Sequence, residues 1–289
     1  MESFKKYLQD NGFRDNTTGQ HQRYAEYYSG WLRRQHLQPQ QAGYNDILSF
    51  IAFCRSEGKK TNNISRIMVS VRHYYSYLQT RHNTGNPAAG VYLRGISREI
   101  PCCLLENEEL DRIYHDYRVT NPRQQRNRVI LGLLIYQGVT TEELHRLETV
   151  HFKPDKGKII IPGGRKSNQR TLNLQPFQVM ELHEYIKETR QNILKETGKT
   201  TEQLIISMKG GTKLKNTMKN LFSMLKKQYP QLKNAKQIRM SVITNKLKTC
   251  NLRQVQYFAG HRYVSSTERY QRGNIEDLQK DIEKYFPLK

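Results

Sequence analysis

Residues 251–270 read NLRQVQYFAGHRYVSSTERY, and this stretch predicts two short helices joined by a turn. Asn251 and Gln254 have the spacing of a capping box, in which each side chain bonds the backbone N–H of the other residue. The helix opened by this box continues to Ala259, and Gly260 stands where a left-handed C-terminal cap is expected. The first helix is therefore predicted to end at a fixed point in the chain.

A second capping box, Ser265 and Glu268, opens a short helix that carries Tyr270. One helix end then holds His261, and the next helix presents Tyr270. Cutting a phosphodiester without a metal needs a nucleophile, a cation for the non-bridging oxygens and an acid for the leaving oxygen. Tyrosine can provide the nucleophile. Histidine can either donate a hydrogen bond to the phosphate or accept and return the proton of the tyrosine.

The charge of the chain points to a polyanionic partner. Its 289 residues include 48 Lys and Arg against 26 Asp and Glu, a formal net charge of +22. The stretch from Gln203 to Thr267 contains no Asp or Glu, although it contains 13 Lys or Arg. Solvated surfaces usually mix both signs, so this run indicates a surface that lies against phosphates. The residues predicted to bind DNA are Lys209, Lys213, Lys215, Lys219, Lys246 and Arg262.

Other classes of protein are disfavoured by the sequence. No window approaches 18 apolar residues, and no apolar run follows the first charges, so neither a membrane span nor a signal peptide is expected. The four cysteines have no metal or disulfide spacing, which fits a reducing compartment such as the cytoplasm. No metal site and no nucleotide loop are visible, so no cofactor is predicted.

The periodicity of apolar residues predicts a mainly α-helical chain of two domains with a small β-hairpin or sheet. Residues 1–81 are predicted to form a helical domain, 82–101 a linker rich in Gly, Pro and Asn, and 102–273 a larger domain. Residues 274–289 are predicted to form a last helix, which either packs on its own domain or docks on a neighbouring protomer.

Local patterns place further breaks and elements. In the first domain, breaks are predicted at Asn11-Gly12 and at 15–19. In the second, a continuous apolar strand at 158–161 and an alternating one at 170–174 predict a hairpin. Helices are predicted near 106–117, 127–135, 176–189 and 216–227.

With these motifs the chain resembles the tyrosine recombinase family, the phage-integrase-like enzymes. Ala259-Gly260-His261 with Tyr270 is similar to the family's Leu-Gly-His and the nucleophilic tyrosine at this spacing. Lys236-Gln-Ile-Arg239 resembles the family's His-x-Leu-Arg element, and Lys166, in the hairpin, matches the family's lysine. Residues 138–147 resemble its Gly-Leu-Arg-x-Ser-Glu-Leu-x-x-Leu element, and residues 86–88 resemble the join between its core-binding (SAM-like) and catalytic domains.

The chain departs from the family pattern at two positions. Lys236 stands where the family usually has His, as in the related type IB topoisomerases. Thr140 stands where the family has its first clamping Arg, and with Glu143 it forms a capping box. Losing a positioned cation typically costs about 10²–10³ in rate. Arg165 and Arg146 are the candidate replacements, with Arg165 preferred because it adjoins Lys166.

The resemblance implies a site-specific DNA recombinase or integrase of a mobile element. Tyr270 would form a 3′-phosphotyrosyl link, Arg239, Lys236 and His261 would stabilise the transition state, and Lys166 would protonate the leaving 5′-oxygen. The partners implied are double-stranded DNA and further copies of the chain, a dimer on each site and a tetramer in synapsis, in a prokaryotic cytoplasm near the nucleoid. The alternatives are a catalytically impaired DNA-binding accessory protein and a type IB topoisomerase-like enzyme.

Overall fold

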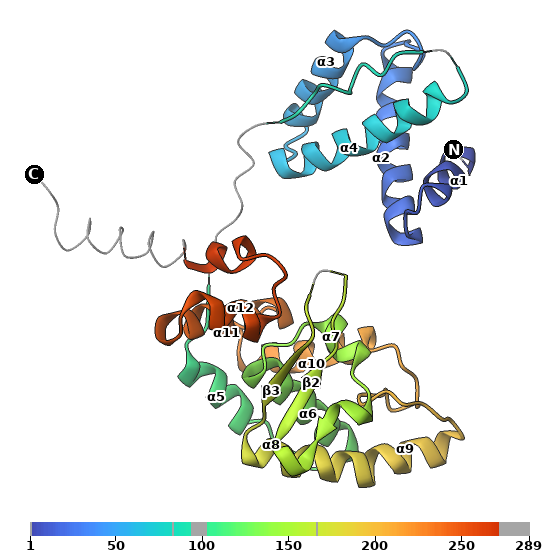
Figure 1. Ribbon diagram of the computed structural model, residues 1–289. Coiled ribbons are helices and arrows are strands. Elements are labelled where there is room, and N and C mark those ends of the chain that lie inside the picture. The colour runs from blue at the N-terminus through green and yellow to red at the C-terminus, as the bar shows by residue number, and fades with distance from the viewer. Residues whose placement is uncertain (1, 83, 94–102, 166, 272–289) are drawn as a thin grey trace, which may run out of the picture. The chain divides into compact units, whose positions relative to one another are not determined.

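The chain folds into two units, each with its own core. The computed structural model describes residues 2–82, 84–93, 103–165 and 167–271, and its units are Met1–Glu99 and Ile100–Lys289 (Figure 1). The predicted helix at 274–289 and Lys166 lie outside the described residues, as do parts of the predicted linker.

The first unit is built from helices α1 to α4. Their bounds are α1 Glu2–Asp10, α2 Asp15–Arg34, α3 Tyr44–Ser56 and α4 Thr61–Gln79. The predicted break at Asn11-Gly12 is confirmed, because Gly12 lies between α1 and α2 with φ of +78°. The break predicted over residues 15–19 is wrong. Asp15 opens α2 with an acid at the helix N-terminus, and the buried face of α2 outweighs the cost of one glycine, about 1 kcal/mol.

Aromatic rings fill the core of the first unit. Tyr28 and Trp31 from α2 pack on Phe50 from α3, with ring centroids 4.8 and 5.3 Å from the Phe50 ring. The buried hydroxyl of Tyr28 lies 2.8 Å from that of Tyr75 on α4, so both polar tips are satisfied inside the core. The tyrosine-rich sequence is therefore used for packing in this unit.

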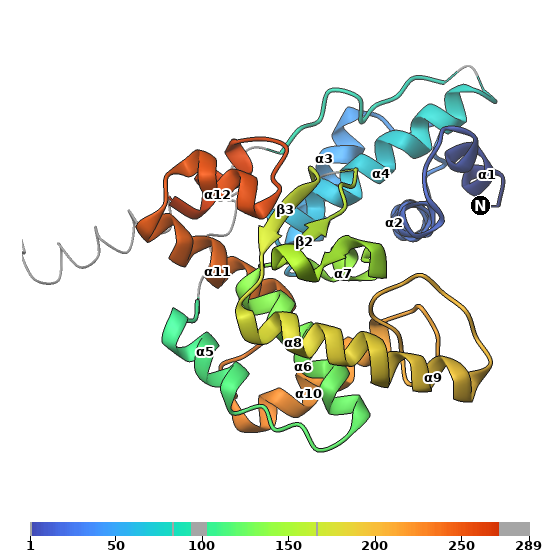
Figure 2. The same ribbon diagram turned by 60° about the horizontal axis from the view of Figure 1, so that its bottom comes forward.

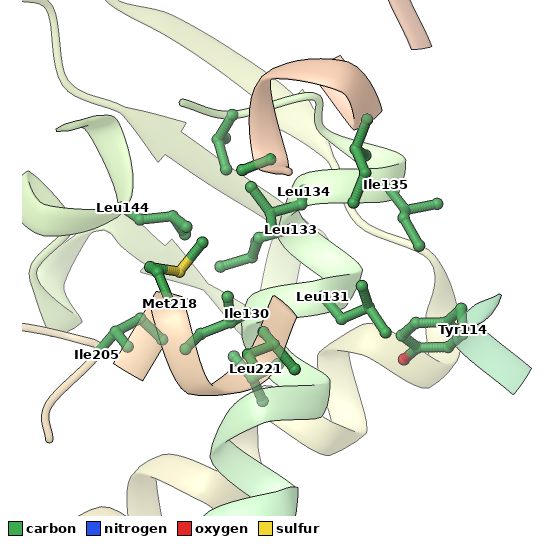
Figure 3. Packing of buried hydrophobic residues seen from close by; sticks show 14 of the residues in the cluster. Tyr114, Ile130, Leu131, Leu133, Leu134, Ile135, Leu144, Ile205, Met218 and Leu221 are labelled. Carbon is green, nitrogen blue, oxygen red and sulfur yellow. The ribbon is translucent and has the colours of Figure 1, made fainter. Parts of the chain in front are cut away.

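Helix α6, Pro122–Tyr136, is the centre of the second unit. Its apolar side chains point in nearly every direction, and Figure 3 shows Ile130, Leu131 and Leu133 meeting residues from surrounding elements. A helix that is hydrophobic all round has to be enclosed. The helices packed along α6, several of them seen in Figure 2, are α5 Asn107–His115, α8 Pro176–Glu184 and α11 Ala235–Thr249. Helices α7 Thr141–Arg146 and α10 Lys215–Gln228 add Leu144, Met218 and Leu221 to the same core, and α9 is Arg190–Thr197. A π-helical turn, Tyr185–Thr189, joins α8 to α9.

A three-stranded antiparallel sheet completes the second unit. The strands, in the order β1-β2-β3, are β1 Phe152–Lys153, β2 Lys158–Ile161 and β3 Arg170–Asn173. The predicted hairpin corresponds to β2 and β3. Strand β1 has two residues and is flanked by the 3₁₀ turns Thr149–His151 and Pro154–Lys156, so no alternation announces it in the sequence.

The predicted fold class, mainly α-helical with a small sheet and two domains, is confirmed. Helices near 106–117, 127–135, 176–189 and 216–227 are all found, with shifted ends. Helix α12, Leu252–Ala259, has the predicted capping box and the predicted left-handed Gly260. Among the described residues, no helix is both long and apolar enough to cross a membrane.

Removing side-chain volume from α6 tests the packing of the core. Leu133→Ala should lower the free energy of unfolding by about 2–5 kcal/mol, because Leu133 is fully buried and the cavity cannot close completely. Met180→Ala on α8 is the matched control, since that side chain is 74% exposed and should cost under about 0.5 kcal/mol. Urea titration of both variants gives the comparison, and equal losses would contradict the packing described here.

Candidate active site

The polar residues singled out in the sequence come together from separate elements of the second unit. Arg239 lies on α11, and α12 ends at Gly260 so that His261 follows directly. The predicted second short helix is found at residues 265–271, and it carries Tyr270. Thr140 and Glu143 lie at the start of α7, where the predicted capping box is formed. Strand β3 contributes Arg170.

Gly260 is required by both backbone and space. Its φ of +66° is a left-handed conformation that residues with a side chain rarely adopt. A Cβ at this position would lie 2.4 Å from Nη1 of Arg170 and 3.0 Å from the carbonyl oxygen of Asn168. The glycine therefore turns the chain towards His261 and also makes room for the Arg170 guanidinium.

A buried carboxylate joins two arginines behind this turn. Arg170 donates from Nη1 to Oε1 of Glu143 at 2.6 Å and from Nη2 to Oε2 at 3.3 Å. Nη1 of Arg239 lies 3.6 Å from the same Oε2. The side chains of Arg170 and Glu143 are 0% and 1% exposed, whereas that of Arg239 is 11% exposed. Only Arg239 of this trio retains access to solvent.

Glu143 is held ionised by its partners. Burial by itself would raise the pKa of this carboxyl, but the hydrogen bonds and charge of Arg170, the backbone N–H of Thr140 and the charge of Arg239 together lower it. Arg239 also donates hydrogen bonds to the carbonyl oxygens of Gly138 and Ala259. Its guanidinium is thereby fixed between the start of α7 and the end of α12.

His261 is neutral at physiological pH. Burial, followed by the positive charges of Arg239 and Arg170, lowers its pKa to about 4. Its Nδ1 lies 2.9 Å from the hydroxyl of Thr267, which is fully buried. A neutral imidazole with one nitrogen engaged by a hydroxyl keeps a second nitrogen for proton transfer.

Tyr270 packs directly on His261. The two rings are stacked, with centroids 6.0 Å apart and planes inclined by 12°. Burial raises the pKa of the Tyr270 phenol, although the charges of Arg239 and Arg269 act in the opposite direction. The phenol is therefore protonated at neutral pH, and its use as a nucleophile requires that a neighbouring group take its proton.

The β2–β3 connection is docked on the histidine turn. The backbone N–H of Asn168 donates to the carbonyl of Gly260 at 2.9 Å, and Ser167 forms an isolated β-bridge with His261. Arg262 donates from Nη1 to the carbonyl oxygen of Arg165 at 3.3 Å. Residues on either side of position 166 are thus joined to the segment that carries His261.

Of the other predicted site residues, Thr140 touches this cluster through Glu143, and no contact of Lys236, Arg146 or Arg165 with Glu143 is seen in the described residues. Lys236 is exposed on α11, one turn before Arg239. Thr140 caps α7 through its hydroxyl, which accepts from the Glu143 backbone N–H. Arg146 donates to the carbonyl oxygen of Gly163 at 2.7 Å, and Arg165 is exposed.

The predicted DNA-binding residues differ in how far their side chains are exposed to solvent. Lys246 is half-buried, with its ammonium 4.5 Å from the centre of the Phe258 ring, so part of its charge already faces a neighbour. The exposed ones are Lys209, Lys213, Lys215, Lys219 and Arg262.

Sequence reasoning missed the role of Arg170 and the link from Glu143 to Arg239. A signal was present, because strand alternation places Arg170 on the same face as Leu172 and Leu174, both of which are buried. A charged residue on the apolar face of a strand indicates a buried partner. The partner itself lies 27 residues earlier in the chain, so spacing could not identify it.

Fold and site together define an enzyme of the tyrosine recombinase class, a DNA strand transferase, as the sequence motifs predicted. The sequence pattern of the phage integrase family matches residues 104–276, and that of the phage integrase N-terminal SAM-like domain matches residues 1–82. The chain belongs to the phage integrase family.

Curated relatives match over almost the whole chain. Tyrosine recombinase XerC of Oceanobacillus iheyensis is 24% identical over 99% of this chain and 95% of that protein. Tyrosine recombinase XerA of Thermococcus kodakarensis is 24% identical over 98% of this chain and 94% of that protein.

Solved structures share the fold at low identity. The XerH site-specific recombinase on palindromic difH substrate, a post-cleavage complex, superposes with a TM-score of 0.68 at 17% identity, over 84% of this chain and 72% of that one. The Tn1549 transposon integrase with a circular intermediate DNA gives 0.66 at 14% identity, over 95% and 98%. These structural neighbours are DNA complexes.

The protonation state of His261 is open to direct measurement. Its ring should titrate near pH 4, because burial and two arginines disfavour the imidazolium. Since the model-compound pKa is 6.5, an unfolded chain takes up the proton first, and this histidine contributes stability that is lost as the pH falls from about 6.5 towards 4. NMR titration of the histidine signals, with His261→Gln identifying the resonance, gives the value. A midpoint near 6.5 would contradict the burial described.

Proposed function

We propose that this protein is a site-specific DNA recombinase of a mobile element that cuts and rejoins DNA through a tyrosine. The observation that carries the proposal is the stacking of Tyr270 on a neutral His261, beside the Arg239 guanidinium. A nucleophile, a proton acceptor and a cation are thereby gathered at one place in the second unit.

In the first step, Tyr270 attacks the scissile phosphorus and forms a phosphotyrosyl bond to the 3′ end. The phenolic proton passes to His261, whose low pKa keeps the imidazole free to accept it. Arg239 stabilises the negative charge that grows on the non-bridging oxygens. The P–O5′ bond breaks, and Lys166 supplies the proton that turns the departing oxygen into a 5′-hydroxyl.

Rejoining reverses these events. A 5′-hydroxyl of the partner strand attacks the phosphotyrosyl phosphorus, displaces Tyr270 and restores a phosphodiester. The energy of the first bond is retained in the covalent link, so the cycle needs no nucleotide hydrolysis. Lys236, which is exposed one turn before Arg239, is proposed to contact the DNA backbone next to the reacting phosphate.

The basic run from 203 to 267 supports binding of double-stranded DNA. Exposed lysines on α10 and in the segment before it offer phosphate contacts, which fix position without reading sequence. Strand exchange between two sites requires one protomer for each cut strand, so we propose a dimer on each site and a tetramer in synapsis. Residues 274–289 are proposed as the segment that docks on a neighbouring protomer, and a prokaryotic cytoplasm, near the nucleoid, as the compartment.

A covalent adduct is the direct test of this function. The DNA flanking the coding region is searched for repeats, which are supplied as nicked duplexes that lose the 5′-hydroxyl strand after cutting. The protein should become linked to the 3′ end, and Tyr270→Phe should abolish the link. Denaturing gels with labelled DNA give the readout.

Tyr263→Phe is the matched control, because Tyr263 lies in the same segment but is 69% exposed. This variant should form the adduct at the rate of the unchanged protein. An adduct that survives Tyr270→Phe would refute the assignment of the nucleophile. Tight DNA binding with no adduct on any substrate would instead favour the accessory protein.

The phosphate contacts should appear in the salt dependence of DNA binding. Lys219→Gln should reduce the slope of log K against log salt by about 1, because one fewer counterion is released. Lys195→Gln on α9 is the control, because this exposed lysine lies outside the basic run and is followed directly by Glu196. Binding measured at several salt concentrations gives both slopes. Equal slopes for the two variants would contradict the proposed DNA face.

A further inference from the structure

The family pattern places a cation at position 140, where this chain has Thr140. The guanidinium of Arg170 arrives at the same place from β3. Oε2 of Glu143 accepts from the hydroxyl of Thr140 at 3.1 Å and from Nη2 of Arg170 at 3.3 Å. A single carboxylate oxygen of Glu143 is therefore shared by Thr140 and Arg170. The guanidinium of Arg170 thus lies close to Thr140, the position at which the family has an arginine.

The position of the Arg170 guanidinium determines the net charge around Arg239. Glu143 is ionised and lies 3.6 Å from Arg239. If Glu143 had no other partner, it would cancel the charge of Arg239, which the proposed reaction needs for the phosphate. Arg170 binds both carboxylate oxygens of Glu143, so the trio of Arg170, Glu143 and Arg239 keeps one net positive charge. That charge is available on Arg239, the only partly exposed member of the trio.

The surrounding backbone is shaped for this arginine. Ile161 pairs with Arg170 in the sheet, which fixes the strand, and Gly260 has no Cβ where Nη1 approaches. Tyr257 on α12 accepts a hydrogen bond at its hydroxyl from the Thr171 backbone N–H at 3.1 Å. Strand β3 is thus joined to helix α12 one residue after Arg170.

We propose that Arg170 replaces the cation missing at Thr140, as a positioning residue that neutralises Glu143 and leaves the charge of Arg239 free for the scissile phosphate. Arg146 and Arg165, the replacements considered from the sequence, do not contact Glu143 in the described residues. This inference rests on the proposed recombinase function. It adds that a cation on strand β3, rather than one at the start of α7, keeps the charge of Arg239 available for the phosphate.

The test compares charged and neutral phosphates at the cleavage site. Adducts captured on the flanking DNA first locate the scissile position, and duplexes are then made with either the normal phosphodiester or an uncharged methylphosphonate there. Arg170→Gln should slow single-turnover cleavage of the phosphodiester by about 10²–10³. On methylphosphonate the loss should shrink by at least about tenfold, because the developing charge that needs a cation is reduced.

Arg126→Gln is the matched control for a purely structural effect. Arg126 is another buried arginine of this unit, bonded to Asn127 and to the carbonyl oxygen of Ile206. Its loss should slow both substrates by the same factor. Circular dichroism and thermal melting of each variant show whether the fold is kept. An equal loss on both substrates for Arg170→Gln would overturn the proposal.

A double variant tests the neutralising role itself. Arg170→Gln together with Glu143→Gln removes one charge of each sign, so Arg239 is again uncompensated. The double variant should cleave the phosphodiester at least about tenfold faster than Arg170→Gln alone, by analogy with the worth of one positioned cation. A double variant as slow as the single one overturns the role assigned to Arg170. Failure of the unchanged protein to form any adduct would overturn the proposed function as well, and so separates the two results.

Discussion

The second unit depends on one buried ion pair, that between Arg170 and Glu143. It connects β3 to the start of α7, and its carboxylate also reaches Arg239 on α11. Removing one partner of such a pair leaves an uncompensated buried charge, which typically costs about 3–5 kcal/mol. Because three elements meet at this carboxylate, it fixes how β3, α7 and α11 lie relative to one another.

The rest of the unit serves to hold those elements in place. Helix α6 is enclosed by helices on several sides, as Figure 3 shows for its leucines and isoleucines, and this packing holds α7 and α11 against the core. The cap at Asn251 and the left-handed Gly260 fix both ends of α12. His261 directly follows the fixed end of α12, and Tyr270 lies on the next short helix. The phenol and imidazole rings stack and shield one another from water.

Burial determines the chemistry of these two rings. It lowers the pKa of His261 and raises that of Tyr270, so the histidine is a base without a proton and the tyrosine an acid that still has one. The nearby arginines strengthen the first effect and moderate the second.

Much of this could be predicted from local patterns. The capping boxes at Thr140 and Asn251, the glycine cap and the hairpin are decided by neighbouring residues, so the sequence alone determined them, together with the family. Helix breaks were less certain, as α2 shows by running through Gly19, because packing of a distant face outweighs one glycine. The tertiary structure alone decided which residue pairs with the Glu143 carboxylate. Arg170 and Glu143 are far apart in the chain and meet only when β3 folds against α7, and no periodicity or spacing encodes a charge pair formed across two elements.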